Sequence, residues 1–61
     1  MKLMRVGAPG QERPAVRRAD GTVIDVSSVV KDYDGAWLAA GGMAALAARL
    51  EEGVDGFPIV D

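Results

Sequence analysis

The side chains that most often carry out catalysis are scarce in this 61-residue sequence. It contains no histidine and no cysteine, so the commonest general base and the most reactive nucleophile are both absent. Its only serines are Ser27 and Ser28, and no base stands in a recognisable motif beside them. We interpret both serines as cap or turn residues. The sequence therefore predicts no catalytic residue in this chain.

Carboxylates occur in two close pairs, but neither pair has the spacing of a metal site. Glu51 and Glu52 are adjacent, so on a helix their side chains diverge by about 100° and do not converge on one ion. Asp32 and Asp34 form an Asp-x-Asp that could bind a hard cation on a loop, but the rest of a ligand loop is missing. Without Cys and His an ordinary zinc site is also excluded. We expect no metal-binding and no cofactor-binding residue here.

Glycine-rich and basic segments are the other candidates for ligand binding. Gly7-Ala8-Pro9-Gly10 and Gly41-Gly42 lack the spacing of phosphate-binding loops, so we interpret them as a turn and a helix break. Arg13, Arg17 and Arg18 form a small basic cluster on a predicted hairpin, without aromatic residues to stack bases. The net charge of −2 and the pI of about 4.9 also disfavour nucleic acid. We interpret this cluster as a solvated or interdomain face.

Charge is distributed unevenly along the chain. Residues 1–19 carry a net charge of +4, and residues 20–61 carry −6. This split could steer a partner, or it could reflect two solvated faces. No segment approaches the ~18 apolar residues of a membrane span, and the first residues lack the apolar core of a signal peptide. We expect a cytoplasmic protein, in keeping with the absence of cysteine.

The length of the chain allows one small domain. A domain of this size buries only about 60% of the surface that its unfolded chain exposes. Much of the 49% hydrophobic content is alanine, which buries little area, and no disulfide is available. We therefore expect contact with another domain or subunit to complete the fold, and the isolated chain to be weakly stable or self-associating.

The residue pattern predicts an α+β fold in which a β-hairpin or three-stranded sheet is followed by short helices. Strands are expected over about 2–7, 13–19 and 22–26. Asp20-Gly21 between the last two favours a two-residue type I′ turn. The resulting register pairs Ala19 with Thr22, Arg17 with Ile24, and Ala15 with Val26. Arg17 then shares a face with Ile24, so either its apolar stem covers that face or the register carries a bulge.

Helical spacing appears three times in the second half of the chain. Ser27 as N-cap, with valines on one side, predicts a helix over about 28–32. Asp34 is the expected cap of a helix over about 35–40, and the glycine pair then separates it from a helix over about 42–52. Gly53 is the expected C-cap of the last helix. Its apolar stripe comprises Met43, Leu46, Ala47 and Leu50. The segment 54–61 is expected to be extended.

Trp37 is the residue whose size could decide how the domain is used. A tryptophan can bury 150–250 Å². It is either the anchor of this domain's own small core or a plug into a neighbouring domain. The sequence leaves both interpretations open.

Four segments in the first 27 residues resemble the opening of bacterial fumarylacetoacetate hydrolase family proteins, in the ureidoglycolate lyase-like subgroup that includes rhamnonate-type diketone hydrolases. These segments are Met1–Gly7, Gly10–Ala15, Ala19–Gly21 and Ile24–Ser27. Val26 replaces the usual leucine. Residues 57–61 match a Leu-Pro-Leu-Val-type segment of the family, and the Ala-Ala-Gly-Gly-Met region matches loosely.

The resemblance implies that residues 1–61 are the small N-terminal domain of a much longer enzyme. Such an enzyme uses Mg²⁺ or Mn²⁺ to stabilise an enolate during C–C bond hydrolysis, or a related lyase or decarboxylase step, on a keto-acid. Its Glu-x-Glu metal ligands and catalytic residues lie in a large C-terminal domain, and no position here matches them. The resemblance also implies a homodimer in which the small domain packs against the catalytic domain. The alternative is a free-standing β-hairpin and helix binding module, such as one for nucleic acid.

Overall fold

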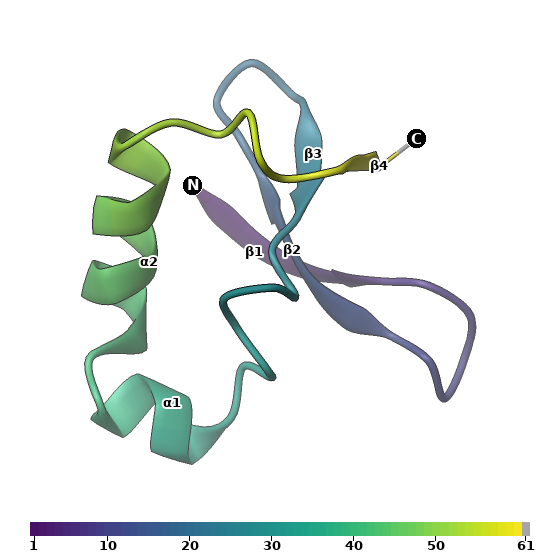
Figure 1. Cartoon of the computed structure of the whole chain (residues 1–61). Helices are drawn as coiled ribbons and strands as arrows, with labels where there is room; N and C mark the ends of the chain where they lie inside the picture. Colours follow the sequence, from purple (N-terminus) through teal and green to yellow (C-terminus); the bar gives the residue numbers. More distant parts are fainter. Residues whose placement is uncertain (61) are drawn as a thin grey trace.

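The computed structural model describes residues 1–60, which form one antiparallel sheet with two helices to one side of it (Figure 1). The strands are β1 (Lys2–Val6), β2 (Arg13–Arg17), β3 (Val23–Asp25) and β4 (Ile59–Val60), in the sheet order β1-β2-β3-β4. The helices are α1 (Gly35–Ala39) and α2 (Gly42–Glu51). The α+β prediction is confirmed, with strands somewhat shorter than expected.

The sheet has four strands where three were predicted, because the C-terminal segment returns to it at Ile59–Val60. Residues 54–57, predicted to be extended, instead form a turn in which the amide of Phe57 donates to the Val54 carbonyl at 3.0 Å. The backbone amide of Asp25 donates to the carbonyl of Pro58 at 2.8 Å, and Val23 lies opposite Val60. Pro58 cannot donate to a ladder, but here it only has to accept. β4 is therefore one edge of the sheet and β1 is the other, so the first and last strands of the described chain form its two edges.

The predicted two-residue turn between β2 and β3 is wrong, and the bulge is the correct alternative. The amide of Gly21 donates to the Arg18 carbonyl at 2.9 Å, and Gly21 has φ 89°. This is a three-residue loop in which glycine supplies the left-handed position after a type I turn. The Asp20 carboxylate accepts from the amide of Thr22 at 2.9 Å and fixes the turn.

The longer loop shifts the register by one residue. Arg17 lies opposite Val23, and Val16 lies opposite Ile24. The predicted partners of Ala15 and Arg17 are therefore wrong. In the observed register Val16 and Ile24 share the face that packs in the hydrophobic core, while Arg17 is exposed on the other face. Burial of this valine–isoleucine pair selects the register, because a one-residue slip would reverse every side chain.

The helix predicted over 28–32 does not form. The chain makes one turn, in which the amides of Val29 and Val30 both donate to the Val26 carbonyl, at 3.0 and 2.9 Å. Val26 and Val30 are buried by this turn, but Val29 is exposed. Arg5 then holds the following residues, donating at 3.1 Å to the Asp32 carboxylate and to the carbonyl of residue 33. The chain is therefore tied to β1 in irregular conformation where the predicted helix would have continued.

The two later helices match their predicted positions within a residue. Asp34 caps α1, accepting from the amide of Trp37 at 2.8 Å. Gly41 has φ 81° and makes the break between the helices. Gly53 has φ 127°, and its amide donates to the Leu50 carbonyl at 3.2 Å just after α2 ends. The predicted helix break is thus confirmed, whereas the C-cap of α2 is Glu52, with Gly53 one residue beyond it.

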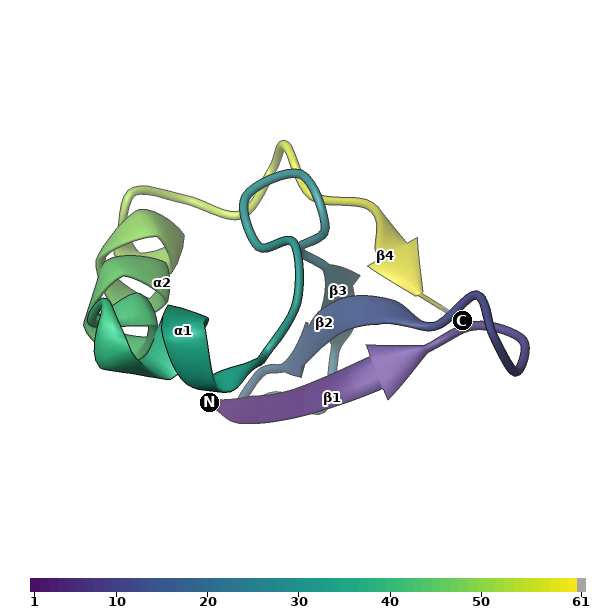
Figure 2. The same ribbon diagram turned by 90° about the horizontal axis from the view of Figure 1, so that it is seen from below.

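A small core lies between the helices and one face of the sheet (Figure 2). Leu46 of α2 is the buried helical residue that reaches this core, and Phe57 closes it from the C-terminal segment. Trp37, Tyr33 and Leu50 are half-buried against it. The buried core residues are Val16, Ile24, Val26, Val30, Leu46 and Phe57.

Tyr33 links this core to the sheet. Its hydroxyl donates to the Ala15 carbonyl at 2.7 Å, and its ring lies 5.1 Å from the Trp37 ring between centroids. Burial raises the pKa of the Tyr33 phenol above its ordinary value of 10.0. The contact therefore depends on a neutral phenol.

Tyr33→Phe should lower the free energy of unfolding by about 1 kcal/mol at neutral pH, because the Ala15 carbonyl loses its donor. Tyr33 also gives the wild type a pH dependence. The unfolded phenol ionises near its ordinary pKa of 10.0, before the folded one, so its stabilising effect is lost as the pH rises through the folded pKa. Urea unfolding should show the two proteins converging above pH 10. A constant difference across that range would contradict this role.

Candidate functional site

Ser27 and Ser28 lie in the single turn after β3, where both are exposed. The amide of Ser27 donates to Asp25 Oδ1 at 2.9 Å, which makes it a turn residue as predicted. No imidazole or thiol exists in the chain to activate either hydroxyl. The turn therefore presents no serine nucleophile with a general base beside it.

Asp25 is the buried charged residue of the described part of the chain, with 9% of its surface exposed. It forms an ion pair with Arg13 of the neighbouring strand. Hydrogen bonding from Ser27 lowers the pKa of Asp25 below its ordinary value despite desolvation, and Arg13 adds to the effect. With its oxygens held by these partners, Asp25 acts as a clasp between the β2–β3 pair and the following turn.

The paired carboxylates have structural roles or face solvent. Asp32 pairs with Arg5 at 3.1 Å, and Asp34 caps α1. Glu51 and Glu52 are exposed at the C-terminal end of α2. Within residues 1–60, no three His, Cys, Asp or Glu side chains are placed to hold a metal ion. The residues present do not fit the Mg²⁺ or Mn²⁺ that the family resemblance implies.

The three arginines predicted to cluster are separated by the structure. Arg13 is engaged with Asp25, while Arg17 and Arg18 lie at the opposite end of β2. Arg17 is directly opposite Lys2 of β1, and Arg18 lies 3.8 Å from Asp20. Lys2, Arg17 and Arg18, here called the basic cluster, surround an open concavity of about 330 Å³.

Trp37 packs against this domain's own core, in agreement with its interpretation as a core anchor. Its indole lies against Gly42, where an added Cβ would overlap the ring. Tyr33 packs on its other side, with the ring planes inclined by 60°. Trp37 nevertheless keeps part of its surface exposed, within a second concavity of about 230 Å³ beside α2.

The helical layer is apolar on its exposed side as well as on its buried side. No residue from 35 to 48 carries a charge. Leu38 and Met43 are 55% and 41% exposed, and the neighbouring alanines are also exposed. A helix that is apolar all round is ordinarily covered by other structure. No helix in the described residues is long and apolar enough to cross a membrane.

The chain is similar to several provisionally named hydrolases of Burkholderia. It is 48% identical over 48 residues to one from Burkholderia multivorans and 46% identical over 48 residues to one from Burkholderia lata. Each match covers 79% of this chain but only 17% of the relative. No family model matches the chain, and no solved structure is significantly similar to it. The chain thus spans about a sixth of the relatives that it matches.

Sequence reasoning missed two features of this surface. The first is the Arg13–Asp25 ion pair, which depends on the strand register. The predicted two-residue turn put that register wrong by one residue. The second is the apolar stripe of α2, in which only Leu46 is buried and Leu50 is half-buried, while Met43 and Ala47 are exposed. The absence of charge over 35–48 was the available signal that this layer needs a further partner.

Proposed function

We propose that this chain is the non-catalytic N-terminal domain of a longer hydrolase of the fumarylacetoacetate hydrolase type. The exposed apolar residues within the uncharged stretch 35–48 carry this proposal, because helical surface that is apolar on every side is ordinarily covered. The short match to much longer hydrolases supports it, since a large remainder is then available to do the covering. The scarcity of catalytic side chains is in keeping with chemistry in that remainder.

In this proposal the remainder holds Mg²⁺ or Mn²⁺ and acts on a keto-acid by C–C bond hydrolysis or a related lyase or decarboxylase step. These details come from the resemblance of the first 27 residues, together with the homodimeric assembly and cytoplasmic location. The role of the present chain is to pack on the catalytic domain.

Co-expression tests this function. The 61-residue chain is produced together with the Burkholderia multivorans relative from which the matched 48 residues have been removed. We expect the two polypeptides to co-purify, and the pair to hydrolyse an acylpyruvate when Mg²⁺ is added. The chain alone should show no turnover. Failure to co-purify, including a remainder that stays insoluble beside the chain, would refute the proposal, as would turnover by the chain alone.

A further inference from the structure

A groove of about 270 Å³ runs between α2 and the end of the β1–β2 pair. Apolar side chains of β2, of α2 and of the residues just before β1 and after β2 line it, together with Arg18 and Glu51. It is called the α2 groove below. Its apolar lining residues are Met1, Val16, Ala19, Ala47 and Leu50.

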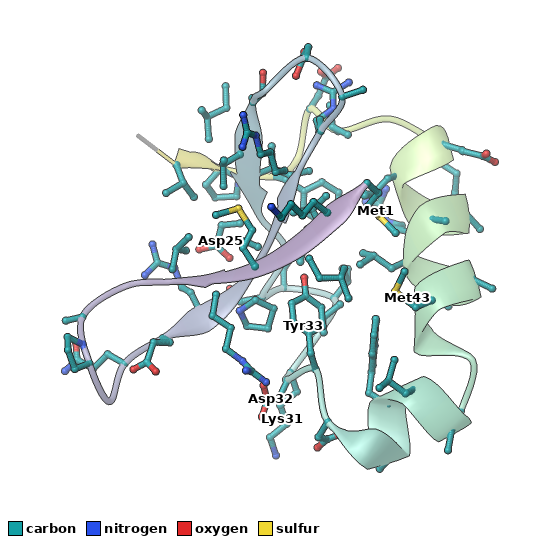
Figure 3. The ribbon with its side chains drawn as sticks, turned by 180° about the vertical axis from the view of Figure 1, so that it is seen from behind. Met1, Asp25, Lys31, Asp32, Tyr33 and Met43 are labelled. Carbon is teal, nitrogen blue, oxygen red and sulfur yellow. The ribbon has the colours of Figure 1, made fainter. Side chains whose placement is uncertain are left out.

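Two partly exposed methionines lie at this side of α2, one of them a lining residue of the α2 groove. Met1 is 51% exposed and Met43 is 41% exposed. Figure 3 shows Met1 beside α2 and Met43 projecting from α2 toward the sheet. Met43, Ala47 and Leu50 follow one another at helical spacing, so they lie on the same side of α2. Methionine adapts its shape to a partner, which suits a surface that packs on assembly.

The basic cluster adjoins this groove. Met1, Arg18 and Ala19 line both the groove and the concavity of the cluster. Lys2 and Arg17 are opposite one another across β1 and β2, an arrangement of like charges that destabilises a sheet. Neither forms an ion pair within residues 1–60. A carboxylate from a partner would relieve this repulsion.

Resting on the function proposed above, we propose that the α2 groove and the basic cluster together form the docking surface for the remainder of the hydrolase. The partner segment places an apolar side chain in the groove and acidic side chains against Lys2 and Arg17. Charge favours this occupant over a second copy of the chain. In a two-fold interface centred on this surface, each basic cluster would meet its own copy.

The other side of α2 is the rival surface. It contains the concavity of about 230 Å³ beside Trp37, whose lining includes Trp37, Ala45 and Arg49. The positive charge at this surface is Arg49, and it already has partners within the chain. Its guanidinium lies 5.0 Å from the centre of the Phe57 ring and donates to the Gly53 carbonyl at 3.5 Å. The rival surface therefore lacks the free charge that would orient an acidic partner.

Ala47→Glu and Ala45→Glu provide a matched comparison on opposite sides of α2. Both alanines are exposed, and both changes place a carboxylate on the same helix. In the co-purified pair, Ala47→Glu should weaken association about tenfold, because it would bury an uncompensated charge. Arg17→Glu should weaken it at low salt, with a smaller effect as salt screens the contact. Ala45→Glu and Lys31→Glu should leave association unchanged.

Titration calorimetry of the purified polypeptides measures these affinities, and circular dichroism of each variant shows that it remains folded. Wild-type association with no loss in Ala47→Glu and Arg17→Glu would overturn the proposed surface while leaving the proposed function intact. A loss confined to Ala45→Glu would assign docking to the rival surface. No wild-type association would instead refute the function. Self-association of the isolated chain that Ala47→Glu abolishes would identify a second copy as the occupant and overturn the proposal.

Discussion

Phe57→Ala should destabilise this chain strongly, by about 3–5 kcal/mol. Phe57 is 5% exposed, and its amide donates to the Val54 carbonyl at 3.0 Å. The Arg49 guanidinium lies 5.0 Å from the ring centre. The ring thus fills the core and attaches the C-terminal segment to α2. Its removal leaves a cavity and frees the segment that carries β4.

Urea unfolding followed by the fluorescence of Trp37, the only tryptophan, measures this effect. Ile59→Ala is the control, because Ile59 is nearby but 71% exposed, and we expect a change within about 0.5 kcal/mol. Since a domain of this size is marginally stable, the Phe57 variant should be largely unfolded without urea. Equal midpoints for the two variants would contradict the anchoring role of Phe57.

Gly42→Ala should destabilise the chain by about 1–3 kcal/mol, although alanine normally favours a helix. An added Cβ at Gly42 would overlap the Trp37 indole, so the ring has to shift. The indole must therefore be displaced from the core. Because the displaced ring is more exposed to water, Trp37 emission should shift to longer wavelength.

Gly35→Ala is the matched control for this helix position. Gly35 also lies at the first position of a helix, and no atom comes within 4 Å of an added Cβ. We expect unchanged emission and a neutral or slightly higher unfolding midpoint. If Gly42→Ala behaved in the same way, the close packing of Trp37 on Gly42 would not contribute to the stability of the domain.

These two substitutions also separate the domain's own stability from its docking. Phe57 and Gly42 are buried in the isolated chain, so their loss should be measurable without a partner. Ala47 and Arg17 are exposed, so their effect should appear only on association. The structure thus predicts two classes of substitution that different measurements detect.

The local chemistry of this sequence determined much of the fold. Asp34 and the glycines at 41, 42 and 53 set the ends of the two helices, because capping and positive φ depend on a few neighbouring residues. The α+β class followed from the order of β-branched runs and helical spacing. The absence of histidine and cysteine restricts catalysis through composition alone, whatever shape the chain adopts.

Contacts between distant residues decided the rest. Burial of Val16 with Ile24 selected the bulged register, and that register brought Arg13 to Asp25. Arg5 contacts Asp32, 27 residues along the chain, in a segment that is irregular where a helix was predicted. The α2 groove likewise exists only because Met1, β2 and the loop after it meet α2 there. A local pattern cannot specify such features, because the energy that selects them comes from surfaces that meet only when the chain has folded.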